Sequence, residues 1–368
     1  MRFFFFSCAA FAIACGTGSS VSNDAGSDVV VTTQNGTWVW TSDAPAGQLN
    51  AVWASSATDA WAGGDDGVML HWNGSAWSVV DPATKNHVNG VWGSSANDVW
   101  AVGGGLGGPN TANLVHWNGQ AWSVVDPGTT SNLDAVWGTG AKDVYAAGAS
   151  GIDGTVVHFD GTSWTLAYNG PDFAPRALGG SGASDVWVAG GPLYPESSDF
   201  MLHGSGQSFA PFATNATQGF YAVWSADASH AWAFGSSGLA RWDGKSWTGV
   251  TSSLAPGEGG LFGLSANAVW AVGDDTQILA WNGSAWIAQH TGTVGGRLRA
   301  IGGVDASHLW AVGENVVMRF DASVTSAPVC SDVHGQCGDA ACGGGHVSDY
   351  ACGGGATCCV SQVACGGG

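Results

Sequence analysis

Four histidines and four aspartates recur at equivalent positions of an internal repeat, and both residue types could do chemistry. The histidines are His71, His116, His158 and His203, and the aspartates are Asp59, Asp98, Asp143 and Asp185. Imidazole and carboxylate groups bind zinc and act as general acids and bases. Equivalent positions in successive repeats are spread apart, so they do not converge on one ion or one substrate. We therefore expect structural histidines, and aspartates that stabilise turns through local backbone amides, with paired catalytic carboxylates as the alternative.

Two acidic pairs are the remaining candidates for a cation. Asp65-Asp66-Gly67 and Asp274-Asp275 offer the oxygen ligands that Ca²⁺ takes. Neither has the spaced Asp-x-Asp-x-Asp pattern of a strong calcium loop. We predict no metal and no cofactor, with Ca²⁺ as the alternative.

One further set of equivalent positions changes its residue type from copy to copy. Each lies at the entry of the innermost predicted strand, and the set is Asn50, Asn89, Asp134, Arg176, Tyr221, Gly259 and Arg299. Such a set should form a ring around one mouth of a central channel. A ring of this kind is either only solvated or contacts a ligand, and its side chains are our candidate ligand-binding residues.

The repeat that positions these residues encodes four short strands. In its first copy the strands are predicted at Leu49 to Trp53, Ala60 to Gly63 and Val68 to Trp72, with the fourth beginning at Ala76. The turn before the fourth strand contains Asn73-Gly74, a pair typical of a type I′ hairpin. One aromatic residue marks the second strand of every copy, roughly every 40 residues, and the set is Trp61, Trp100, Tyr145, Trp187, Trp232, Trp270 and Trp310. Seven copies predict an all-β, seven-bladed propeller with four-stranded antiparallel blades.

The two ends of the repeat region predict how the ring closes. The last copy lacks its Trp-bearing fourth strand, and Asn35 to Trp40 reads as a fourth strand without a blade. We expect the N-terminal strand to complete blade seven. The 21 Trp residues recur in register with the strands, so we expect most of them to pack between blades and not to bind sugars.

The [Asn/Asp]-Gly-x-x-Trp and Asp-Val-Trp-Ala-Val-Gly elements resemble the repeats of exported bacterial propellers in the broad BNR and tectonin group. The resemblance covers roughly residues 35–321 and implies the fold. The Asp-box of sialidase-type propellers has a residue between its Asp and Gly, whereas Asp160-Gly161-Thr162-Ser163-Trp164 has none. Sialidase chemistry is therefore not implied.

The lengths of the loops predict which face of the propeller binds a ligand. The connections between the second and third strands are expanded in three adjacent blades, at Gly103 to Asn113, Gly148 to Thr155 and Gly190 to Phe200. These connections emerge on the same face of the propeller as the predicted ring of variable residues. Tyr194 lies in the third of them and is a candidate contact residue.

The N-terminus indicates export. Residues 1–14 read as a signal peptide, and residues 15–28 as a flexible tether that follows Cys15. Residues 12–15 resemble a bacterial lipobox and also fit an ordinary Ala-x-Ala cleavage site. We predict a lipid anchor on Cys15 in the cell envelope, with the outer membrane as the expected membrane and simple secretion as the alternative.

A cysteine- and glycine-rich tail, residues 327–368, follows the propeller at residues 29–326. Its cysteines are Cys330, Cys337, Cys342, Cys352, Cys358, Cys359 and Cys365. The absence of a Cys-x-x-Cys pair and an oxidising compartment favour disulfides over zinc.

The net charge of the chain excludes one class of binding partner. A formal charge of -19, with only nine Lys and Arg, opposes nucleic-acid binding. We expect a monomeric, non-catalytic propeller that binds a glycan or an envelope protein and contacts the membrane only through its anchor. A glycan hydrolase and a structural adhesion component are the alternatives.

Overall fold

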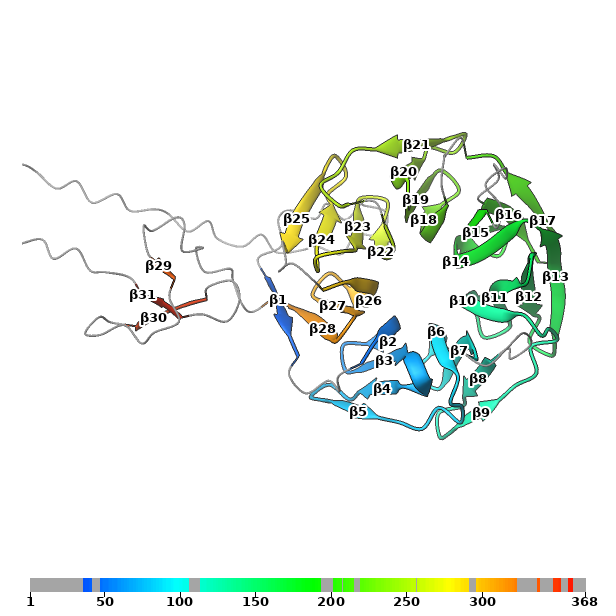
Figure 1. Ribbon diagram of the computed structural model, residues 1–368, viewed down its shortest axis with the longest axis horizontal. Coiled ribbons are helices and arrows are strands. Elements are labelled where there is room, and N and C mark those ends of the chain that lie inside the picture. The colour runs from blue at the N-terminus through cyan, green and yellow to red at the C-terminus, as the bar shows by residue number, and fades with distance from the viewer. Residues whose placement is uncertain are drawn as a thin grey trace, which may run out of the picture.

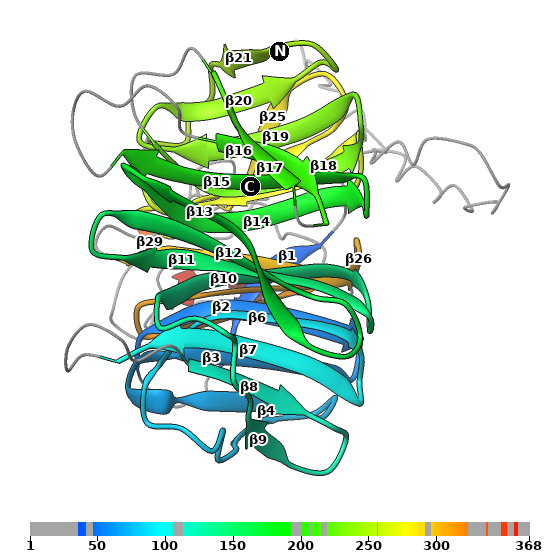
Figure 2. The ribbon, with the colours of Figure 1, turned by 90° about the vertical axis from the view of Figure 1, so that its right-hand side faces the viewer.

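A computed structural model of the 368-residue chain describes residues 36–41, 47–105, 113–192, 201–206, 208–214, 219–255, 257–290 and 296–322, and three short strands of the tail. Seven four-stranded sheets surround a central axis, and each strand pairs antiparallel with its neighbours (Figure 1). This confirms the predicted seven-bladed propeller. Figure 2 shows the ring from its side, with the strands crossing its thickness and the turns at its two faces. No helix in the described part of the chain is long and apolar enough to cross a membrane.

The first four blades follow the chain from the inside outward. Blade 1 contains β2 (Leu49–Ser56), β3 (Asp59–Gly64), β4 (Met69–Trp72) and β5 (Trp77–Val79), with the short 3-10 helix η1 (Asp65–Gly67) between β3 and β4. Blade 2 contains β6 (His87–Ser95), β7 (Asp98–Gly104), β8 (Asn113–Trp117) and β9 (Trp122–Val124). Blade 3 contains β10 (Asn132–Gly140), β11 (Asp143–Ser150), β12 (Asp153–Phe159) and β13 (Trp164–Pro171). Blade 4 contains β14 (Phe173–Gly182), β15 (Asp185–Pro192), β16 (Met201–Ser205) and β17 (Ser208–Phe212).

Blades 5 to 7 have the same strand order, except that the outer strand of blade 7 comes from the N-terminal part of the chain. Blade 5 contains β18 (Phe220–Asp227), β19 (His230–Gly235), β20 (Gly238–Trp242) and β21 (Trp247–Val250). Blade 6 contains β22 (Gly260–Ser265), β23 (Ala268–Val272), β24 (Ile278–Trp281) and β25 (Trp286–His290). Blade 7 contains β26 (Leu298–Asp305), β27 (His308–Gly313), β28 (Val316–Asp321) and, at its outer edge, β1 (Thr37–Trp40).

The outer strand of blade 7 confirms the predicted closure. β1 pairs antiparallel with β28, and Trp38 lies opposite Phe320. The first described residues are thus hydrogen-bonded to the last strand of the ring, which joins the two ends of the propeller and leaves no gap between blades.

The core lies between neighbouring blades, as the periodic aromatic residues predict. All seven marker aromatics of the second strands are buried. Trp61, for example, packs against Trp117 and Trp122 of the next blade, with ring centroids 5.1 and 5.2 Å away. Each blade therefore buries the face that it cannot cover by itself.

The Asn-Gly and Asp-Gly turns before five of the outer strands differ in type from the prediction. Gly74 has a φ of 93°, whereas Asn73 is not among the residues with positive φ. A type I′ turn would need positive φ at both of its central residues, so the type I′ prediction is wrong. The Asn73 side-chain oxygen instead accepts hydrogen bonds from the backbone amides of Ser75 and Ala76, both at 3.0 Å, and Gly74 becomes the first central residue.

The tail contains a three-stranded sheet of β29 (Gln336–Cys337), β31 (Thr357–Cys359) and β30 (Val347–Ala351). Cys337, Cys358 and Cys359 lie on these strands. The other predicted disulfide cysteines, Cys330, Cys342, Cys352 and Cys365, and also Cys15, lie outside the described residues.

Candidate functional site

The residues of the predicted ring do gather at one mouth of the central channel. A cavity of about 420 Å³ is lined by Asn50, Asn89, Asp134, Arg176, Tyr221, Gly259 and Arg299, together with Gln48, Asp65, His87 and Glu258. A narrower cavity of about 170 Å³ continues along the inner strands. The larger volume lies in the range of small-ligand sites and admits a few side chains, not a folded domain.

A β-bulge directs these side chains into the channel in six of the seven blades. The pairing of β2 with β3 passes from Leu49 directly to Ala51, so Asn50 is the extra, unpaired residue. The same interruption falls at Asn89, Asp134, Arg176, Tyr221 and Arg299. Bulges turn one side chain out of the regular alternation of a strand. Blade 6 has no bulge at this end, and its equivalent residue, Gly259, carries no side chain.

Glycines at the end of the second strand make room for the bulge in the six blades that have it. A Cβ atom on Gly148 would overlap the carbonyl oxygen of Asn132, two residues before Asp134. Gly64 and Gly103 meet the equivalent carbonyls of Gln48 and His87. The repeated glycine therefore belongs to the site, because no larger residue allows this approach.

The ring residues of blades 1 and 2 are bound to the protein itself. The Asn50 amide donates to the Asp65 carboxylate at 2.9 Å and to the Val88 carbonyl of the next blade at 3.2 Å. The Asn89 amide donates in the same way to the Asp134 carboxylate at 3.0 Å and to the Leu133 carbonyl at 3.3 Å. These two asparagines connect blades 1, 2 and 3 around the mouth.

Arg299 in blade 7 is also engaged. Its guanidinium donates to Glu258 at 3.3 Å and to Glu314 at 3.2 Å. The neighbouring Arg297 donates to Asp274 at 2.6 Å and to Glu258 at 2.9 Å. This network neutralises both arginines on the side of blades 6 and 7.

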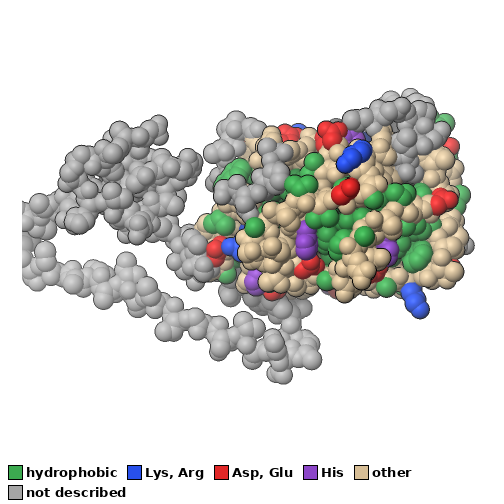
Figure 3. Space-filling view, turned by 90° about the horizontal axis from the view of Figure 1, so that it is seen from below, with side chains coloured by type: hydrophobic (Ala, Val, Ile, Leu, Met, Phe, Trp, Pro, Cys, Tyr) green, Lys and Arg blue, Asp and Glu red, His purple; other side chains and the backbone are tan. Residues whose placement is uncertain are grey.

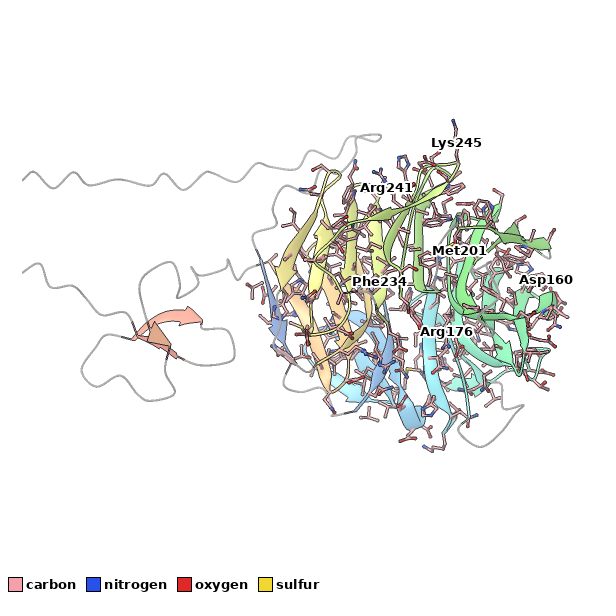
Figure 4. All side chains as sticks on the ribbon, turned by 45° about the horizontal axis from the view of Figure 1, so that its top comes forward. Asp160, Arg176, Met201, Phe234, Arg241 and Lys245 are labelled. Carbon is pink, nitrogen blue, oxygen red and sulfur yellow. The ribbon has the colours of Figure 1, made fainter. Side chains whose placement is uncertain are left out.

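Arg176 in blade 4 differs from these two arginines. It is exposed, and no described residue forms an ion pair with it. Its guanidinium lies over the Tyr221 ring of blade 5, 5.7 Å from the ring centroid. In Figure 4 Arg176 lies in the interior of the ring, whereas Asp160 and Lys245 lie at its periphery.

Asp134 in blade 3 completes this side of the mouth. Burial in the channel wall raises the pKa of its carboxyl above the usual 3.8, although the charge of Arg176 and the hydrogen bond from Asn89 act in the opposite direction. Asp134, Arg176 and Tyr221 therefore form a local group, which we call the blade 3–5 group.

The expanded loops lie partly outside the described residues. Residues 106–112 and 193–200 are not described, and Tyr194 is among them. The described loop of blade 3 is a hairpin between β11 and β12, and its Ile152 is 49% exposed. Ile152 is an apolar candidate contact on the same face as the mouth that sequence reasoning missed, and its position at a hairpin tip was the available signal.

The opposite ends of the strands contain the recurring His and Asp residues, which pair within each of blades 1 to 4. The Nε2 atoms of His71, His116, His158 and His203 lie 2.6–2.8 Å from the carboxylates of Asp59, Asp98, Asp143 and Asp185. Each imidazole also stacks on the buried aromatic of its second strand, as His71 does on Trp61 at 4.2 Å. The structural interpretation of the histidines agrees with this geometry.

The aspartates have partners other than the predicted ones. Asp59 accepts a hydrogen bond from the Ser55 hydroxyl in addition to His71, and Asp185 accepts one from Ser181. The prediction that they hold local backbone amides is therefore wrong, because these bonds go to side chains. Burial by itself would raise the pKa of Asp185, but hydrogen bonds from His203, Ser181 and Ser225 outweigh it and lower the pKa below the usual 3.8.

The acidic pairs considered for calcium have protein partners. Asp65 accepts from Asn50 and lies 3.1 Å from the His87 imidazole, and Asp274 is bound by Arg297. Within the described ranges no group of three or more His, Cys, Asp or Glu residues is arranged to hold a metal ion.

Comparison with known proteins places the chain among propellers by structure alone. No protein-family model matches it, and neither does any curated sequence. A solved structure described as YCF48 bound to D1 peptide matches with a TM-score of 0.61 and 14% identity, over 79% of this chain and 98% of the other. YCF48 from Cyanidioschyzon merolae matches with a TM-score of 0.58 and 14% identity, over 78% and 99%. The WD40 propeller domain of Doa1 matches with a TM-score of 0.58 and 12% identity, over 74% and 92%. At these identities the likeness shows the fold.

Proposed function

We propose that this protein is a non-catalytic recognition propeller that binds an extended segment of a partner protein at the channel mouth. The observation that carries the proposal is the blade 3–5 group: a bulge-presented Arg176 with no described ion-pair partner, set on Tyr221 beside a cavity of about 420 Å³. An exposed guanidinium on an aromatic ring offers a charge, hydrogen-bond donors and an apolar surface together, which is the composition of interface hot spots.

The His–Asp pairs support recognition in preference to hydrolysis. In a serine hydrolase the hydroxyl contacts the imidazole, which accepts its proton, and the carboxylate lies behind the imidazole. Here the Ser55 hydroxyl donates to the Asp59 carboxylate, and His71 contacts the same carboxylate from its other side. The order of the three groups therefore gives no activated nucleophile.

Two further observations favour a polypeptide ligand. The structurally similar YCF48 is described as bound to a peptide. The mouth is also too small for a folded domain but large enough for a few residues of an extended chain. A glycan, which the sequence also allows, is the competing ligand in the test.

The test is a selection of random phage-displayed peptides on the immobilised full chain, run beside a glycan array. The mouth variant Arg176→Ala, Tyr221→Ala should lose the peptides that the wild type enriches. Lys245→Ala removes a positive charge from an exposed turn between β20 and β21, at the opposite ends of the strands, and should retain them. Enrichment that is equal on all three proteins, or saturable glycan binding without peptide binding, would reject the proposal.

The proposed location is outside the cytoplasm, with a lipid on Cys15 and oxidised cysteines in the tail. Residues 1–35 supply the support, because the apolar leader and the residues around Cys15 fit an export signal. The mass of the mature protein tests this directly. An acylated N-terminal Cys15 is the expected species, and a species that retains residues 1–14 would contradict export.

A further inference from the structure

The choice of ligand at the mouth follows from how its cations are paired. Of the three arginines at or next to the mouth, Arg297 and Arg299 form ion pairs with Asp274, Glu258 and Glu314. Arg176 has no described ion-pair partner. Its planar array of donors matches a carboxylate, to which arginine forms two parallel hydrogen bonds.

We infer that the bound segment presents a carboxylate, from an Asp or Glu side chain or from a chain terminus, to Arg176. This rests on the proposed function and specifies its ligand. The Tyr221 ring supports the guanidinium from one side, because Arg176 lies 5.7 Å from its centroid. The Tyr221 hydroxyl lies 3.4 Å from the Ser236 hydroxyl, which keeps the ring oriented toward the mouth.

The rest of the molecule offers few other positive charges to an acidic segment. The chain has nine Lys and Arg against 28 Asp and Glu, so an acidic segment is repelled by most of the surface. Figure 3 shows how few Lys and Arg side chains one outer side of the ring carries. An acidic segment that binds must therefore do so where a positive charge is not already neutralised.

Asp134 is the internal competitor for the same guanidinium. It stands at the equivalent bulge position of the preceding blade, and the Arg176 charge acts on its carboxyl. In its ionised form Asp134 places a negative charge near Arg176. A ligand carboxylate must enter against that charge, so the removal of the Asp134 charge should strengthen binding.

The experiment uses synthetic peptides from the phage selection, each in two forms, measured on the full chain by isothermal calorimetry. One form keeps its Asp, Glu and C-terminal carboxylates, and the other carries Asn, Gln and a C-terminal amide. We expect the carboxylate form to bind about tenfold more tightly to the wild type, since a charge-assisted bidentate contact exceeds a neutral one by about 1.4 kcal/mol. Arg176→Gln should abolish this preference, and Asp134→Asn should increase it.

The outcomes separate this inference from the proposed function. If the two peptide forms bind with equal affinity and Tyr221→Ala still abolishes binding, the inference of a ligand carboxylate is rejected. The proposal of peptide recognition at the mouth then stands. A preference that survives Arg176→Gln overturns the assignment to Arg176. Weaker binding by Asp134→Asn would show that Asp134 helps to hold the ligand, which contradicts its role as competitor. If no peptide depends on the mouth, the proposed function itself fails.

Discussion

Trp38 in β1 and Phe320 in β28 pack edge to face with ring centroids 5.6 Å apart, although they lie at opposite ends of the propeller sequence. The indole of Trp38 also donates to the side-chain oxygen of Gln289 in blade 6, at 3.4 Å. This one side chain therefore connects the closing strand to two blades.

Closure gives the first prediction. Trp38→Ala should lower the free energy of unfolding by about 3–5 kcal/mol, because it removes a large buried side chain at the junction of the ring. Trp40 lies two residues further along the same strand and is 54% exposed. Trp40→Ala should therefore cost about 1 kcal/mol or less. Guanidinium unfolding of both variants is the measurement, and equal losses would show that β1 does not lock the ring.

The bulge gives the second prediction. Gly148→Ala places a Cβ against the Asn132 carbonyl and should destabilise the protein by about 2–3 kcal/mol, since the strands must separate or the bulge must shift. Gly140→Ala in the same blade meets no atom within 4 Å and should have little effect. Thermal unfolding compares the two variants. A tolerated Gly148→Ala would show that the bulge can relax, and hence that the glycine does not position Asp134.

The mouth arginines give the third prediction, which separates structural from ligand-binding roles. Arg299→Gln removes two ion pairs and should reduce stability by about 1 kcal/mol, because these pairs are partly exposed. Arg176→Gln should change stability by less than about 0.5 kcal/mol. Urea unfolding of the two variants decides this, and a large loss in Arg176→Gln would mean that Arg176 holds the fold.

The fourth prediction concerns pH. The pKa of Asp185 is lower in the folded protein than its usual 3.8, so its ionised form stabilises the fold. The advantage of wild type over Asp185→Asn should be complete above about pH 4 and should shrink as the pH falls through the lower, folded pKa. At pH about 7 we expect the free energy of unfolding of the wild type to exceed that of Asp185→Asn by about 1–3 kcal/mol, measured by chemical unfolding.

Asp66→Asn is the matched control, because Asp66 is exposed and asparagine tolerates its left-handed backbone, with φ of 55°. Its stability should follow that of the wild type at every pH. If the difference in the free energy of unfolding between wild type and Asp185→Asn stayed constant down to pH about 2, the Asp185 carboxylate would not be the source of the stabilisation.

The number of blades could be predicted from the amino-acid sequence alone, and so could the strand order and the closing strand. These features follow from local signals: the recurring aromatic of the second strand, the Asn-Gly and Asp-Gly turns, and the unmatched strand at residues 35–40. Hydrophobic periodicity and turn chemistry act over a few residues, so they can be read without a structure.

The positions of the ring residues were also predictable, because Asn50, Asn89 and their equivalents differ among repeats that otherwise agree. Which of these side chains are free to contact a ligand could not be predicted. The tertiary structure alone reveals that six of the seven ring residues stand on a bulge and that Asn50 and Asn89 are bonded to the next blade. It also reveals that acids from three places in the chain pair with Arg297 and Arg299, which leaves Arg176 on Tyr221. Those contacts join residues far apart in the sequence, and their geometry depends on the register of pairing and the closure of the ring, which no local pattern encodes.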